Sequence, residues 1–279
     1  MLVPLTDVLR YAEEKKIAIG AFNVTSFEAL RGLVQAAEEE GLPLILQFAP
    51  RGHSVYLPQR FAGPLLLAVA REAKVPTAVH LDHGSSLDVL RWGLEQGFSS
   101  VMFDGSALPF EENITQTQEA SRLTRAAGAS LEAELGALGV GEDGEASVER
   151  YTDPEQAEIF ARETEIDALA CSFGTVHGLY KAQPCLDVPR IAEIHRRTGL
   201  PIVMHGGSGV SDAEYARCIE AGVRKINYYT YAARDVGVEV CERISEAAEY
   251  PYMHTLSNWA AEAFYKHYLR VMRLFAGRN

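Results

Sequence analysis

The sequence predicts an α/β fold, a single (β/α)8 or TIM barrel with an additional C-terminal helix, over residues 1–279. Three observations indicate this fold. Short apolar runs of strand length alternate with longer stretches in which apolar residues recur at helical spacing. The alternation repeats eight times. Eight strand–helix units in 279 residues fit a closed barrel better than an open doubly wound sheet, because such a barrel typically takes about 250 residues.

The expected strands are the eight short apolar runs, in chain order residues 18–24, 42–48, 77–83, 99–105, 130–136, 166–172, 200–206 and 224–230. The stretches between them are amphipathic, and several end at a glycine, which commonly caps a helix. Strands that alternate with helices imply parallel pairing with right-handed crossovers. Residues 254–277 predict the additional helix, whose aromatic residues pack within the chain or against another subunit.

The segment 137–153 interrupts the alternation. It is long, acidic and rich in glycine, and it follows the fifth expected strand. In a barrel, this position lies over the face where the strands end at their carboxyl termini. We therefore expect a loop above the active site, either a simple mobile connection or one that carries a catalytic group.

The composition excludes some classes of function and favours others. The net charge of −12 argues against sequence-independent nucleic-acid binding, which requires a basic surface. No apolar run is long enough to predict a membrane span, and the N-terminus lacks the pattern of a signal peptide. The four cysteines are scattered without a CxxC pair, which favours reduced thiols in the cytoplasm. An anionic substrate would need local positive charge from a metal, a lysine or backbone N–H groups.

Three histidines occupy the positions where a barrel places its active site. His83 ends the third expected strand, His177 follows the sixth, and His205 ends the seventh. Three imidazoles with an open fourth position are typical of catalytic zinc. We expect the other histidines to be surface, packing or core residues: His53, His80, His195, His254 and His267. For His80 we expect the side of its strand opposite to His83.

A carboxylate and two glycine-bearing loops accompany these histidines. Asp82 precedes His83 and predicts either an acid/base beside the metal or a supporting, solvated carboxylate. Residues 205–209 follow the seventh strand and 227–230 end the eighth, each before a helix. Loops at these two places commonly bind phosphate in this fold, since glycine lets the backbone approach the oxygens and the helix N-terminus favours negative charge.

These motifs resemble those of the class II, zinc-dependent fructose- and tagatose-bisphosphate aldolases. The resemblance runs from about residue 1 to 275 and is carried in order by GAFNV (20–24), HLDHG (80–84), LEAELG (131–136), GTVHGLYK (174–181), HGGSG (205–209) and KINYYT (225–230). It implies an aldolase that reversibly cleaves a ketose bisphosphate, fructose or tagatose 1,6-bisphosphate, to dihydroxyacetone phosphate and an aldehyde such as glyceraldehyde 3-phosphate.

The resemblance also implies roles for matching residues. One Zn²⁺ would be bound by His83, His177 and His205, with Asp82 as the acid/base at the aldehyde oxygen. Glu142 would move protons at the dihydroxyacetone phosphate carbon. The residues implied to meet substrate or phosphate are Asn23, Gly178, Lys181, Gly206, Gly207, Ser208, Asn227 and Thr230. A monovalent cation often sits nearby. The acidic residues Asp104, Glu132 and Glu134 match positions that can hold a second metal, or they form a carboxylate network that supports the histidines.

Alternatives stay open at this point. The chain could act on another ketose phosphate, as a metal-dependent hydrolase, as a Schiff-base aldolase through Lys181 or Lys225, or as a non-catalytic sugar-phosphate sensor. Tyr228 and Tyr229 depart from the smaller residues of the family, and we expect them to narrow the pocket. The resemblance further implies a cytoplasmic homo-oligomer, a dimer or tetramer, with a role in carbohydrate metabolism such as glycolysis.

Overall fold

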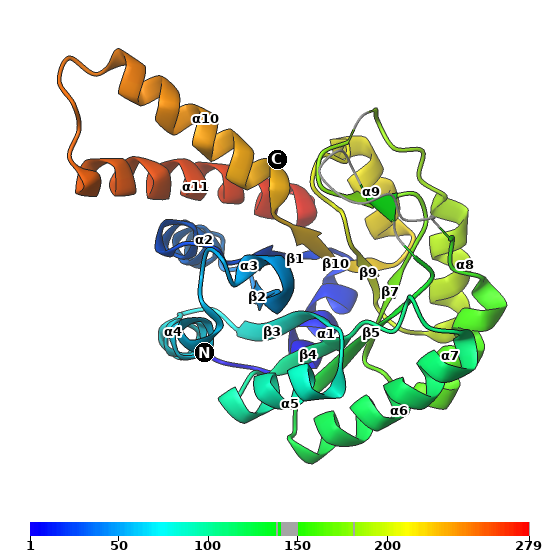
Figure 1. Ribbon diagram of the computed structural model, residues 1–279. Helices are drawn as coiled ribbons and strands as arrows, with labels where there is room; N and C mark the ends of the chain where they lie inside the picture. The colour runs from blue at the N-terminus through cyan, green and yellow to red at the C-terminus, as the bar shows by residue number, and fades with distance from the viewer. Residues whose placement is uncertain (138, 141–149, 181, 279) are drawn as a thin grey trace.

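The computed structural model describes residues 1–137, 139–140, 150–180 and 182–278. Its centre is a closed barrel of eight parallel strands in the order β1-β10-β9-β7-β5-β4-β3-β2 (Figure 1). The barrel strands are β1 (Ile19–Asn23), β2 (Leu44–Phe48), β3 (Thr77–Gly84), β4 (Ser100–Phe103), β5 (Ser130–Leu135), β7 (Ala168–Cys171), β9 (Ile202–Met204) and β10 (Val223–Tyr228). Each expected strand is found, so the predicted fold is confirmed.

Helices surround the barrel, and those between α1 and α10 connect its parallel strands. They are α1 (Leu5–Lys15), α2 (Phe27–Glu40), α3 (Pro50–His53), α4 (Gln59–Glu72), α5 (Leu87–Gln96), α6 (Phe110–Ala126), α7 (Pro154–Thr164), α8 (Val188–Thr198), α9 (Asp212–Glu220), α10 (Thr230–Glu246) and α11 (Met253–Phe275). Local sequence fixes many of their ends. Ser26 caps α2 by accepting a hydrogen bond from the Ala29 N–H, and Gly41 ends the same helix in the left-handed conformation.

The barrel interior is apolar at one end and polar at the other. Helix α1 closes the N-terminal end, where its Leu5, Val8 and Leu9 pack against inward-facing residues such as Ile45 and Val203. Further along the strands, the inward positions carry buried polar side chains instead: Asn23, Gln47, His80, Asp82, Glu132, Glu134, Lys225 and Asn227. These polar groups lie toward the C-terminal ends of the strands, so they make up the floor of the site.

Helices α10 and α11 form an antiparallel pair that extends to one side of the barrel (Figure 1). Helix α11 packs against α2 so closely that a Cβ on Gly32 would lie 2.7 Å from the backbone nitrogen of Tyr265. The expected additional helix over 254–277 is thus confirmed as α11. No described helix is both long and apolar enough to span a membrane.

The Tyr228 side chain packs in this helix interface, although the residue also borders the pocket beside Tyr229. Its ring lies 6.1 Å from that of Phe275 and its hydroxyl 2.9 Å from His267 Nε2. Strand alternation explains the direction: Asn227 points into the barrel, so its neighbour points out. The Tyr228 ring therefore points away from the barrel interior, and the expectation that both tyrosines narrow the pocket stays a prediction.

A second small sheet escaped the sequence analysis. Strand β6 (Gly139–Val140) pairs in parallel with β8 (Val176–His177) outside the barrel. Two-residue strands are too short for a period of two to be visible in a sequence. This sheet holds His177 beside the ends of the barrel strands. Most of the predicted loop 137–153, including Glu142, lies outside the described residues, as does Lys181.

Candidate active site

A backbone irregularity at the end of β3 turns two neighbouring side chains toward the same cavity. The pairing of β3 with β4 shifts register between Leu81 and Gly84, and His83 has φ of 50°. Positive φ is uncommon for a residue other than glycine and clusters at functional sites. Neighbours on a regular strand face opposite ways, so the irregularity is what lets Asp82 and His83 both reach the cavity.

The three predicted histidines come together in the structure. The ring centroids of His83 lie 4.8 Å from His205 and 5.1 Å from His177. Each residue offers a nitrogen, and these atoms all lie within 4.8 Å of one another. His83 Nε2 and His205 Nδ1 are 3.2 Å apart and point at the same place. The arrangement suits a metal ion bound between the rings.

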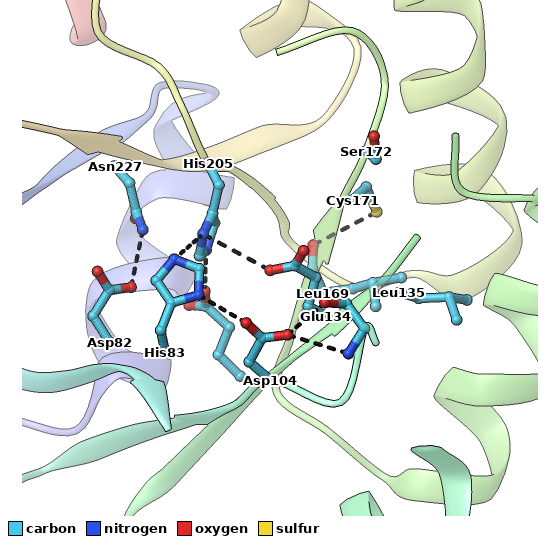
Figure 2. Close-up of polar contacts among 12 residues, drawn as sticks. Asp82, His83, Asp104, Glu134, Leu135, Leu169, Cys171, Ser172, His205 and Asn227 are labelled. Atoms are coloured by element: carbon cyan, nitrogen blue, oxygen red, sulfur yellow. Dashed lines mark hydrogen bonds and ion pairs between the residues drawn. The ribbon is translucent and has the colours of Figure 1, made fainter. Parts of the chain in front are cut away.

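In two of these three histidines, the ring nitrogen that faces away from the other imidazoles contacts a carboxylate. His83 Nδ1 lies 3.0 Å from Asp104 Oδ2 (Figure 2). His205 Nε2 lies 2.9 Å from Glu132 Oε1. A metal-binding histidine usually donates its second N–H to such a group, which sets its tautomer and raises its basicity. The two contacts leave His83 Nε2 and His205 Nδ1 as the nitrogens available to an ion.

Glu134 has a buried oxygen that no hydrogen bond satisfies in the described part of the chain. Glu134 Oε2 makes no hydrogen bond among the described residues and lies 4.0 Å from His205 Nδ1. An unsatisfied buried carboxylate is costly, and a cation between it and the imidazoles would satisfy it. His83, Asp104 and Glu134 also form a second group of atoms close enough to share an ion.

Burial and neighbouring charges shift the protonation of the cluster. Burial lowers the pKa of His177 to about 3 and also lowers that of His205. His83 differs: despite its burial, the charges of Asp82 and Asp104 raise its pKa to about 10. Burial, reinforced by the Asp104 charge, raises the pKa of Glu134 well above its ordinary value. A divalent cation bound among these groups would therefore displace protons from the site.

Amide side chains hold the Asp82 carboxylate, which is only 3% exposed. Asn227 Nδ2 donates to Oδ1 at 3.2 Å, while Asn23 Nδ2 and Gln47 Nε2 donate to Oδ2 at 3.0 and 3.3 Å. Burial would raise the pKa of Asp82, but the charges of His83, His205 and Lys225 hold it well below the ordinary value. Asp82 is thus an oriented, ionised carboxylate beside the histidines.

Lys225 is fully buried in the barrel below this carboxylate. Its Nζ lies 2.9 Å from Glu132 Oε2 and donates to Asn227 Oδ1 at 2.8 Å. A lysine paired in this way is not a free nucleophile, which argues against the Schiff-base alternative at this residue. Glu132 accordingly contacts both Lys225 and His205, and their charges, acting against its burial, lower its pKa to about 2.

His80 points into the barrel, on the same side of β3 as Asp82, and its Nε2 lies 3.7 Å from Glu132 Oε2. The orientation expected from the sequence is therefore wrong, although the expected core position is right.

The predicted phosphate loops border the same space. A cavity of about 770 Å³ is lined by residues from several strand ends, among them Asn23, Asp82, His83, Asp104, Glu134, His177, Gly178, Gly206, Ser208, Asn227 and Thr230. Thr230 begins α10, whose N-cap residue Tyr229 makes no side-chain capping hydrogen bond within the described residues. Gly207 is not among the residues that line the cavity. Its carbonyl oxygen accepts a hydrogen bond from the Tyr215 hydroxyl, and its N–H donates to the backbone carbonyl of Asn227.

Two polar residues of the site were missed or misjudged. His53, expected on the surface or in packing, lines the cavity with its ring 4.8 Å from that of Tyr229. His53 follows β2, and residues that follow a barrel strand lie at the face of the active site, as the sequence predicts for His83. The same criterion could therefore have predicted His53 from the sequence. Gln47 was also missed, because an amide inside an apolar strand carries no motif.

Eight parallel strands with polar groups converging at their carboxyl ends define the class of (β/α)8-barrel enzymes. Comparison with known proteins narrows this class. The family model for fructose-bisphosphate aldolase class-II matches residues 3–279. A probable fructose-bisphosphate aldolase of Bacillus subtilis is 40% identical over 233 residues, covering 82% of this chain and 81% of its own.

Two further relatives have different names. A 6-phospho-5-dehydro-2-deoxy-D-gluconate aldolase of Bacillus licheniformis is 37% identical over 230 residues, covering 82% of this chain and 79% of its own. The crystal structure of the YdjI aldolase from Escherichia coli K12 superimposes with a TM-score of 0.87 at 33% identity, covering 99% of this chain and 97% of its own. The chain belongs to the class II fructose-bisphosphate aldolase family and is an aldolase, a carbon–carbon lyase. Enzymes of this family act on sugar phosphates and generally depend on a metal ion.

Proposed function

We propose that the chain is a zinc-dependent aldolase that reversibly cleaves a ketose bisphosphate, fructose or tagatose 1,6-bisphosphate, to dihydroxyacetone phosphate and an aldehyde such as glyceraldehyde 3-phosphate. The observation that carries this proposal is the meeting of three imidazoles at a cavity that Asp82, His83 and His177 line together with Gly206 and Ser208. A hydrolase needs a metal and a carboxylate but not this loop, so the arrangement favours the aldolase.

The residues present fit one zinc ion. His83, His177 and His205 would hold it, since neutral nitrogens in this number are the usual donors of catalytic zinc. When bound, Zn²⁺ supplies a Lewis acid that stabilises negative charge on the substrate oxygens. Asp104 and Glu132 are both engaged with histidine and other donors. We therefore assign these two carboxylates to supporting the histidines and not to a second metal.

The chain's own residues handle the protons and the phosphate. In cleavage, Asp82 takes the proton from the hydroxyl that becomes the aldehyde oxygen, and in synthesis it returns this proton. Asn23, Gln47 and Asn227 keep its carboxylate in place. The backbone at Gly206 and Ser208 and the N-terminus of α10 receive the phosphate. Glu142, outside the described residues, would move the proton at carbon.

A retro-aldol screen tests this function. Purified protein is assayed for dihydroxyacetone phosphate release from fructose 1,6-bisphosphate, tagatose 1,6-bisphosphate and 6-phospho-5-dehydro-2-deoxy-D-gluconate, because relatives of similar identity differ in the substrates they are named for. We expect release from one of the two bisphosphates, abolished by a chelator. Absence of release from every ketose phosphate would refute the aldolase proposal, and activity on the deoxygluconate alone would replace the substrate.

We further propose that the enzyme works as a cytoplasmic homo-oligomer, a dimer or tetramer. The turn between α10 and α11 supports this, because Tyr250, Tyr252 and Met253 there are 98%, 75% and 76% exposed. Large apolar side chains gathered on a surface favour contact with another chain. Light scattering of the purified protein should give a multiple of 30.6 kDa, and a mass of one chain would contradict the proposal.

A further inference from the structure

His53 occupies a wall of the cavity to which the proposed mechanism gives no task. It ends α3, in the loop that follows β2, and its side chain meets two neighbours. Its ring lies 4.8 Å from that of Tyr229 at an angle of 55°, and its Nδ1 lies 3.4 Å from Asn23 Nδ2. The ring is thus held in a fixed orientation at the edge of the space that the substrate would fill.

The hydrogen bonds around Asn23 determine the tautomer of His53. A carboxylate only accepts, so the Asn23 amide must turn its NH₂ group toward Asp82 Oδ2, 3.0 Å away. The Asn23 carbonyl oxygen then accepts from Gln47 Nε2 at 2.8 Å, as the structure shows. The second hydrogen of the same NH₂ group faces His53 Nδ1, which must therefore accept. The ring proton accordingly resides on Nε2.

Burial also favours the neutral form of the ring. Burial lowers the pKa of His53, although the nearby Asp82 charge opposes the shift. A neutral imidazole whose Nδ1 is occupied offers a single N–H donor. Such a group recognises an oxygen atom by direction and not by charge.

His53 lies on the side of the cavity formed by β1, β2 and β3. The loops proposed for phosphate follow β9 and β10, and His53 meets the second of these only through the ring of Tyr229. Asn23 links His53 to Asp82, which acts at the aldehyde oxygen in the proposed mechanism. Next to His53, Ala49 contributes only a methyl group to the cavity wall. The imidazole is therefore the polar group that this loop presents to the aldehyde half.

We propose that His53 determines specificity for the aldehyde half of the substrate, by donating its Nε2–H to a hydroxyl oxygen of that fragment while Tyr229 fixes the plane of the ring. This inference rests on the proposed aldolase function. It predicts that the enzyme prefers an aldehyde with a hydroxyl group beside the carbonyl over the same aldehyde without it.

Two variants separate the hydrogen bond from the packing. His53→Phe keeps a ring against Tyr229 but has no donor, and His53→Gln restores an N–H donor without the ring. Condensation with dihydroxyacetone phosphate is measured for glycolaldehyde against acetaldehyde and for 2-hydroxypropanal against propanal. For His53→Phe we expect kcat/KM with the hydroxylated aldehydes to fall about 3- to 10-fold, the size of one hydrogen bond, with little change for the others. His53→Gln should recover part of the preference.

Exchange of the carbon-bound hydrogen of dihydroxyacetone phosphate with solvent, followed by NMR without any aldehyde, isolates the other half-reaction. We expect this exchange and the KM for dihydroxyacetone phosphate to stay within twofold of wild type in His53→Phe. Equal aldehyde preference in the wild type and His53→Phe would overturn the inference, and so would parallel losses in exchange and condensation. A wild-type protein with neither exchange nor condensation would instead refute the proposed function. Thermal melting and zinc content of each variant verify that it is folded.

Discussion

Replacement of Asp104 by asparagine tests how the carboxylates support the proposed metal site. The Asp104 carboxylate uses both oxygens: Oδ2 lies 3.0 Å from His83 Nδ1, and Oδ1 accepts from the Ser106 hydroxyl at 2.7 Å. An asparagine at this position would keep the shape of the side chain and lose its charge. His83 would then be a weaker and less firmly oriented ligand, because the carboxylate no longer accepts its N–H.

The expected magnitude follows from the single contact that is lost. Removal of a partner of this kind typically weakens metal binding 10- to 100-fold, which corresponds to about 1.4–2.7 kcal/mol. A competition titration with a chromophoric chelator measures the zinc Kd, and elemental analysis measures the zinc bound per chain. We expect Asp104→Asn to raise the Kd within this range while the chain still binds one zinc.

Ser106→Ala is the matched control. It removes a neutral donor to Asp104 but keeps the carboxylate on His83, so the zinc Kd should change less than about threefold, as for one neutral hydrogen bond. A Kd for Asp104→Asn within twofold of wild type would refute the supporting role. If wild type binds two zinc ions per chain and Asp104→Asn binds one, the supporting role is also refuted, because Asp104 would then be a ligand of a second metal.

Three more predictions follow from the site and its surroundings. Asp82→Asn removes the proposed acid/base and should lower kcat at least about 100-fold with zinc content unchanged; turnover near wild type would contradict the role. Gly206→Ala should lower activity and the affinity for dihydroxyacetone phosphate, because Gly206 has φ of 62° and an added Cβ would overlap the Val176 carbonyl oxygen; unchanged steady-state constants would show that the loop tolerates the shift. Burial raises the pKa of Tyr228 to about 12 from 10, so its contribution to stability is complete below pH 10 and is lost as pH rises through about 12. Urea unfolding at pH 9 and at pH 11.5 measures how far the free energy of unfolding falls between the two. This fall should be about 1–2 kcal/mol smaller in Tyr228→Phe than in wild type, and equal falls would contradict the raised pKa of Tyr228.

Strand positions were predictable because each barrel strand is a short, nearly continuous apolar run between amphipathic stretches. Placing His83, His177 and His205 at strand ends was enough to expect them in one cluster, and the structure brings them together. The orientation of Tyr228 was also within reach, since alternation along the strand sends it outward once Asn227 points inward.

Other features depended on tertiary contacts that leave no local signal. The register shift that lets Asp82 and His83 face the same cavity involves pairing with β4, a neighbour that the sequence of β3 does not specify. Lys225 resembles a nucleophile at a strand end, and only its contact with Glu132 shows that it is paired. His53 was expected on the surface or in packing because it lies in a loop or helix; its place after β2 was visible in the sequence, but its contacts with Asn23 and Tyr229, which are distant in sequence, were not.

The central claim is that His83, His177 and His205 bind the zinc ion on which cleavage depends. Stepwise addition of zinc to chelator-treated protein, with dihydroxyacetone phosphate release measured at each step, tests this most directly. We predict no release without metal, a linear recovery that saturates at one zinc per chain, and no recovery in His205→Ala. Full activity after chelation, together with a borohydride-trapped covalent adduct of dihydroxyacetone phosphate, would contradict the claim and point to a lysine instead.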